Sequence, residues 1–188
     1  MIPSDPQQIL TIVLLTYVSA VAVIDLRSRR IPNGLSLVAA VAGLALNGLG
    51  GGFTGLAGAG LGLAIALLAF LPMYAGGGLG AGDVKAMAAV GALVGVPGIF
   101  ITVGFTLIGG AIAAVAILIL AGELVPAVQR LHANLLLAKA GGPVGSIRPA
   151  AGEMAARRFP YGLAIAGGVC AASWWMGRLQ ALVTGGMQ

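Results

Sequence analysis

Charged residues are scarce in this chain of 188 residues, where they make up 8% of the sequence and hydrophobic residues make up 59%. Soluble domains carry about 25% charged residues, which keep their surfaces in water. The scarcity of charge argues against a soluble enzyme and against a disordered chain. It favours a protein that crosses a membrane several times.

Cysteine and histidine are nearly absent. The single cysteine, Cys170, excludes an intramolecular disulfide and a zinc site built from several cysteines. The single histidine, His132, has no second metal-ligand candidate near it in the sequence, and we assign it no catalytic role. We therefore expect neither a metal nor another cofactor.

Several familiar patterns are also missing. The ten Lys and Arg residues are not interleaved with aromatic residues, so we expect no nucleic-acid partner. Residues 1–8 carry neither a basic segment nor a cleavage site, which favours a retained first helix over a signal peptide. The 32 glycines have no period of three, which excludes collagen, and in a bilayer they allow helices to pack closely.

Long apolar runs are what the sequence does contain. A membrane core about 30 Å thick needs about 20 apolar helical residues, and no alternating strand pattern suggests a barrel. The short fourth run is separated from the fifth by the turn signal Val96-Pro97-Gly98. The sequence predicts an all-α bundle of about six transmembrane helices, forming one membrane-embedded domain over residues 1–188. The runs are 8–26, 34–50, 55–75, 84–96, 98–121 and 160–182.

The distribution of positive charge predicts the orientation. With six spans, nine of the ten cationic residues fall on one side of the membrane, and this side should be cytoplasmic, with both termini outside. Arg178 is the exception, and its long side chain can reach the outer interface. The nine are Arg27, Arg29, Arg30, Lys85, Arg130, Lys139, Arg148, Arg157 and Arg158.

The segment 122–159 is the one sizeable stretch outside the apolar runs. Leu124, Val128, Leu131 and Leu135 recur at helical spacing within it. This spacing predicts an amphipathic helix on the inner leaflet, which either anchors the loop or guides a substrate.

Two of the five acidic residues stand at the edges of apolar helices. Asp25 ends the first predicted helix and Asp83 begins the fourth, so the topology brings both to the same interface. Ionisable residues at membrane depth are costly and are candidates for function. The alternatives are that Asp25 balances neighbouring arginines and that Asp83 is a helix N-cap.

Two neighbouring carboxylates suit acid–base chemistry. Because both cannot easily ionise together, they can share a proton and divide the roles of acid and base. One then takes a proton from water while the other protonates a peptide carbonyl. The sequence offers no serine–histidine pair and no HExxH motif that would compete with this assignment.

The segments around the two aspartates resemble the type IV prepilin peptidases, which are GxGD-type aspartic peptidases of prokaryotic membranes. The resemblance rests on a D-x5-IPN motif, on GxGDxK, and on Pro-Tyr-Gly opening the last apolar run, and it spans essentially the whole chain. The matching segments are Asp25-Leu26-Arg27-Ser28-Arg29-Arg30-Ile31-Pro32-Asn33, Gly80-Ala81-Gly82-Asp83-Val84-Lys85 and Pro160-Tyr161-Gly162.

Carried over by position, the resemblance implies that Asp25 and Asp83 are the catalytic pair. It further implies that Gly80 and Gly82 shape the approach to the second aspartate. Lys85, Pro32 and Asn33 match the remaining motif positions and are candidates for substrate approach. We expect Lys85 either to face substrate or to serve the lipid interface, and Pro160 to be a helix-start proline.

The resemblance also implies a substrate. Larger members carry paired CxxC motifs and are associated with pilin N-methylation, whereas this chain has one cysteine and looks like the short Tad/Cpa-type branch that processes Flp-like pilins. The expected activity is removal of a prepilin leader peptide at the cytoplasmic face of the inner membrane, without methylation. A small transporter or channel and a pilus-assembly scaffold are the alternative classes.

Overall fold

The structure is a computed structural model that describes residues 6–76, 78–142 and 161–185, and these parts of the chain are helical throughout apart from short turns. This confirms the predicted all-α fold class. Each predicted apolar run lies in a helix, and one further helix occupies the predicted amphipathic segment. The helices are α1 (Pro6–Ser28), α2 (Asn33–Ala75), α3 (Ala81–Val94), α4 (Gly98–Leu120), α5 (Leu124–Lys139) and α7 (Tyr161–Gly185).

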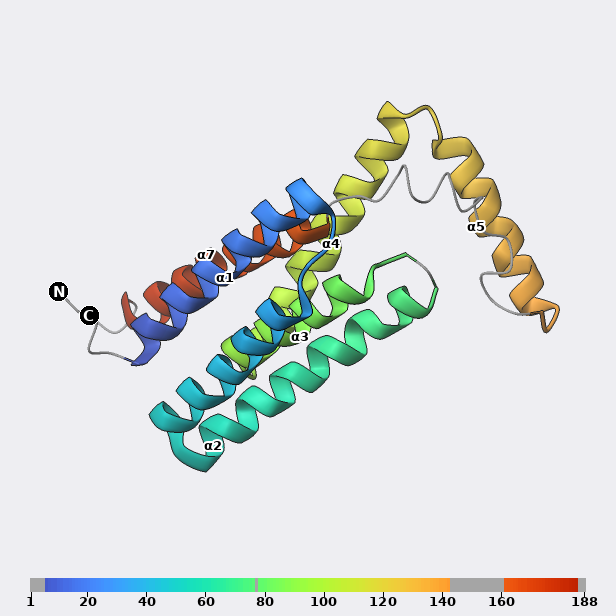
Figure 1. Ribbon diagram of the computed structural model, residues 1–188. Coiled ribbons are helices and arrows are strands. Elements are labelled where there is room, and N and C mark those ends of the chain that lie inside the picture. The colour runs from blue at the N-terminus through green and yellow to red at the C-terminus, as the bar shows by residue number, and fades with distance from the viewer. Residues whose placement is uncertain (1–5, 77, 143–160, 186–188) are drawn as a thin grey trace.

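Helix α2 contains two of the predicted runs, 34–50 and 55–75, rather than one. Its backbone reverses direction at Gly52, which has φ 60° and ψ −144°, a conformation that favours glycine. The two limbs of α2 therefore lie side by side and antiparallel, as Figure 1 shows. The two predicted runs therefore match the two limbs of α2 in position. They are described as one helix because helical hydrogen bonding continues up to the reversal on both sides.

Helix α3 packs against both limbs of α2 through small residues. A Cβ at Gly43 would lie 2.7 Å from the backbone of Ala92, and a Cβ at Gly62 or Gly91 would overlap the backbone carbonyl of the other glycine. With 14 residues, α3 is about 21 Å long and shorter than a bilayer core. Its side chains from Ala86 to Leu93 are buried, so it is an inner helix of the bundle.

Helices α1 and α7 form a second antiparallel pair, which α4 crosses (Figure 1). Gly110 of α4 lies against the ring of Tyr161, where a Cβ would be 2.7 Å from the hydroxyl oxygen. Phe105 of α4 stacks at a tilt on Trp175 of α7, with ring centroids 6.3 Å apart. The core between the two helix groups contains, among others, Val18, Val21, Phe70, Met87, Val90, Ile99, Ile165 and Val169.

Three helices in the described part of the chain are long and apolar enough to cross a membrane. They comprise residues 7–28, 33–75 and 98–120, and the second includes both limbs of α2. Large hydrophobic side chains such as Leu49, Phe53 and Leu120 are more than 80% exposed, which suits contact with lipid rather than water. The chain is a membrane protein.

Helix α5 confirms the helix predicted within segment 122–159. It extends from the end of α4 away from the other helices in Figure 1, and none of its residues is buried. Gly122 and Gly141, with φ 69° and 78°, form the turns at its two ends. Residues 143–160, which include three of the predicted cytoplasmic arginines and Pro160, lie outside the described residues.

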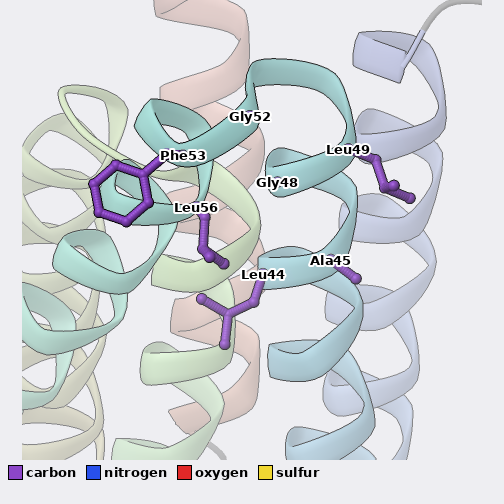
Figure 2. Close-up of a pocket in the computed structure, with 7 residues that line it drawn as sticks. All are labelled: Leu44, Ala45, Gly48, Leu49, Gly52, Phe53 and Leu56. Carbon is purple, nitrogen blue, oxygen red and sulfur yellow. The ribbon is translucent and has the colours of Figure 1, made fainter.

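An apolar groove lies at the α2 reversal (Figure 2). Its volume is about 540 Å³, and no charged side chain lines it. The lining residues are Leu44, Ala45, Gly48, Leu49, Gly52, Phe53 and Leu56. The groove is at the end of the bundle away from Asp83, because α3 runs from Asp83 toward this reversal.

Candidate active site

Asp25 is buried near the C-terminal end of α1, where only 5% of its surface is exposed. The backbone amide of Gly162 in α7 donates a hydrogen bond to Asp25 Oδ2 at 2.7 Å. A buried carboxylate requires such a donor, because leaving it unpaired away from water is costly. The two residues are 137 positions apart, so this contact joins distant parts of the chain.

Gly162 has no space for a side chain. A Cβ at this position would lie 2.8 Å from Asp25 Cβ and 2.9 Å from Asp25 Oδ2, closer than carbon and oxygen atoms normally approach. The sequence reasoning did not include Gly162 among the candidate site residues. The Pro160-Tyr161-Gly162 motif was the signal that could have identified it.

Asp83 lies in the first turn of α3 and is partly buried. Its Oδ2 accepts a hydrogen bond of 3.0 Å from the backbone amide of Gly80. Gly80 is the N-cap residue of α3 and Asp83 the third helical residue, which corrects the alternative that Asp83 is itself the cap. The positive end of the helix dipole favours a carboxylate at this position.

The two sequence motifs around the aspartates contact each other. A Cβ at Gly82 would lie 3.3 Å from Cβ of the buried Ile31, so Gly82 allows α3 to approach the α1–α2 turn closely. Lys85 Nζ donates a hydrogen bond of 3.0 Å to Asn33 Oδ1 on the surface beside this contact. Pro32 is the exposed, extended N-cap of α2 in the same turn.

Tyr161 is buried next to Gly162 at the start of α7, and its side chain is 7% exposed. Its ring packs edge-on against Phe70 of α2, with centroids 6.1 Å apart. The start of α7 therefore contacts α1 through the hydrogen bond from the Gly162 amide to Asp25 and contacts α2 through the Tyr161 ring.

Metal-ligating side chains do not gather into a site of three or more His, Cys, Asp or Glu in the described ranges 6–76, 78–142 and 161–185. His132 is exposed on α5, a helix that contacts only α4 among the described elements. The carboxyl groups of Asp25 and Asp83 can each accept and donate a proton. This chemistry is sufficient for acid–base catalysis.

Comparison with known proteins identifies the family. The type IV leader peptidase family matches residues 12–121, a stretch that includes Asp25, Asp83, all of helices α2, α3 and α4, and most of α1. No curated protein and no solved structure matches the chain. Because the matched stretch exceeds half of its length, the chain belongs to the type IV leader peptidase family.

Proposed function

We propose that this membrane peptidase is an aspartic endopeptidase that removes the leader peptide of Flp-like type IV prepilins. The observation that carries the proposal is that Asp25 and Asp83, both within the family match, lie in segments that contact each other. Gly82, which precedes Asp83, packs against Ile31 in the turn that follows α1 and Asp25. Two carboxylates brought to one end of the bundle can divide the roles of acid and base. In this proposal the whole chain, residues 1–188, acts as one membrane-embedded domain.

The proposed reaction is a direct hydrolysis. The ionised aspartate takes a proton from water, whose oxygen attacks the peptide carbonyl carbon, while the protonated aspartate gives its proton to the carbonyl oxygen. The aspartate that gave its proton then takes one from a hydroxyl of the tetrahedral diol, the C–N bond breaks, and the other aspartate gives the proton it took from water to the leaving nitrogen, which restores both carboxyl groups. No acyl-enzyme forms, because neither carboxylate bonds to the substrate carbon.

The proposed substrate is a prepilin with a short basic leader and a long apolar helix. The apolar helix packs laterally against the outer surface of the bundle. Exposed side chains on this surface include Leu37 and Val38, which lie near the start of α2 at Asn33. This arrangement leaves the leader junction beside the two aspartates. The resemblance to prepilin peptidases suggests cleavage after a glycine of the leader.

The proposed location is the inner membrane, with the aspartates facing the cytoplasm and both termini outside. Arg27, Arg29 and Arg30 support this orientation, because all three are exposed just after Asp25 and positive charge accumulates on the cytoplasmic side. Lys85 is bonded to Asn33, which follows Arg30 by three residues in the sequence. A leader entering from the cytoplasm would reach the aspartates without crossing the bilayer.

The proposal is tested by co-expressing the chain with a candidate prepilin and following leader loss by gel shift. Wild type should cleave, whereas Asp25→Asn and Asp83→Asn should each reduce cleavage by about 10³-fold or more, since each removes an acid–base group. Glu123→Gln, which neutralises an acidic residue at the start of α5, is the matched control and should cleave normally. Normal cleavage by either aspartate variant would refute the two-aspartate mechanism.

A further inference from the structure

We propose that Gly162 is a positioning residue for the reaction, whose amide fixes Asp25 Oδ2 and whose missing side chain leaves room for the carboxylate. This inference rests on the proposed function, because it concerns how the catalytic Asp25 is held. It adds a residue of α7 to a site whose aspartates come from α1 and α3. Gly162 lies outside the stretch matched by the family.

The amide of Gly162 is available because of its place in α7. The first four N–H groups of a helix have no acceptor within that helix, and Gly162 is the second residue of α7. Asp25 Oδ2 supplies the acceptor at 2.7 Å, a short distance typical of hydrogen bonds to a charged oxygen. With Oδ2 held by this amide, Oδ1 is the Asp25 oxygen that remains for proton transfer in the proposed reaction.

The space at Gly162 admits no larger residue without displacement of Asp25. A Cβ would contact Asp25 Cβ at 2.8 Å, Oδ2 at 2.9 Å and Cγ at 3.2 Å, so rotation of the carboxylate alone would not relieve the overlap. Since Asp25 Cβ is bonded directly to the α1 backbone, the two helices would have to separate. Gly167, further along α7, has no atom within 4 Å of an added Cβ.

The consequence of this contact is a specific kinetic signature. A displacement of a catalytic group by about 1 Å can slow a reaction about 100-fold, even when the change lies outside the reacting atoms. The apolar helix of the substrate is bound elsewhere on the bundle and would be unaffected. A positioning role for Gly162 therefore predicts a lower kcat at an unchanged KM.

The first test compares purified Gly162→Ala and Gly167→Ala with wild type on a synthetic prepilin. Gly162→Ala should lower kcat by about 10- to 100-fold with KM within about twofold, and Gly167→Ala should match wild type. A wild-type kcat for Gly162→Ala would overturn the inference. A rise in KM that accounts for the whole loss of kcat/KM would also overturn it.

The second test detects the contact without measuring activity. Gly162→Ala should lower the unfolding temperature in detergent, and it should cause no further loss in an Asp25→Gly background, where the overlapping side chain is gone. Additive losses would overturn the inference, and so would an unfolded Gly162→Ala protein that Asp25→Gly fails to restore. If wild type cleaves no prepilin, the proposed function fails, while this cycle still decides the Asp25–Gly162 contact.

Discussion

The two ends of the bundle use polar groups in different ways. At the hairpin end, formed by the α2 reversal and the end of α3, Asn47 donates to the carbonyl oxygens of Gly43, Ala92 and Leu93 at 2.9–3.3 Å. At the aspartate end, formed by the end of α1 and the starts of α2, α3 and α7, the carboxylates of Asp25 and Asp83 accept from backbone amides.

The two ends differ in the kind of polar group that makes the hydrogen bonds, which is an amide side chain at the hairpin end and two carboxylates at the aspartate end. The Asn47 amide closes the end of α3 by hydrogen-bonding carbonyls that the helix leaves unpaired, and the surface beside it is an apolar groove. Each aspartate instead accepts a hydrogen bond through Oδ2 from a backbone amide at the start of a helix. One end is built for stability, and the other holds the two proposed catalytic carboxyl groups.

Among the variants that compare the two ends, Gly82→Val, at the aspartate end, is expected to have the largest effect on leader cleavage. Its branched side chain would enter the contact with Ile31, where even a Cβ would be at 3.3 Å, and would displace α3 from the α1–α2 turn. We expect kcat/KM for leader cleavage to fall about 100-fold, because Asp83 moves with α3. Gly51→Val at the hairpin end, where nothing lies within 4 Å, should retain activity. Equal losses in both variants would erase the distinction between the ends.

Tyr161→Phe should have the next largest effect. The substitution keeps the ring packed on Phe70 and removes only the buried hydroxyl at the start of α7. We expect kcat/KM to fall about 10-fold, with an unchanged unfolding temperature, since a polar group next to Gly162 and the proposed catalytic Asp25 is lost. Tyr74→Phe, at an exposed tyrosine near the end of α2, is the control. Unchanged kinetics for Tyr161→Phe would mean that α7 contributes to the proposed active site through the Gly162 amide and not through the Tyr161 hydroxyl.

Asn47→Leu should separate stability from catalysis. The variant loses the hydrogen bonds to the α3 carbonyls, and buried polar contacts between membrane helices contribute about 1 kcal/mol. The free energy of unfolding, measured with denaturant in mixed micelles, should fall by about that amount while kcat of the folded protein stays constant. A large loss of kcat would mean that the hairpin end also controls the reactive groups.

Lys85→Met should have the smallest effect. The Lys85–Asn33 hydrogen bond is exposed, and exposed charged contacts contribute about 0.2–1 kcal/mol. We expect kcat/KM to fall about two- to threefold, and the double variant with Asn33→Ala to lose no more than either single variant. Additive losses would show that Lys85 acts on the substrate independently of Asn33.

The fold was largely predictable from the sequence because membrane-spanning helices leave a local signal. Apolar runs located α1, α4 and both limbs of α2, and the helical spacing of leucines located α5. The continuity of α2 through Gly52 was not predictable, because glycine is equally compatible with a loop. The sequence also suggested that α3 was short, and the structure explains this by its burial against α2.

The candidate site was predictable only in part. Asp25 and Asp83 stood out because charged residues are rare in this sequence. The motifs near them included the residues of two contacts, Gly82 with Ile31 and Lys85 with Asn33. The Pro160-Tyr161-Gly162 motif marked Gly162, but its hydrogen bond to Asp25 was not predictable, because 137 residues separate the partners. The contacts of Asn47 were not predictable either, since its acceptors in α3 are backbone carbonyls 45 and 46 residues away.

The distance in sequence between Asp25 and Gly162 has a consequence for biosynthesis. The ribosome adds Gly162 137 residues after Asp25, so both aspartates are synthesised before the amide that holds Asp25. Until α7 packs beside α1, the Asp25 carboxylate lacks that hydrogen bond. Under the proposed mechanism, a nascent chain therefore carries both acidic groups before its site is complete, and the packing of α7 sets the moment at which proteolysis can begin.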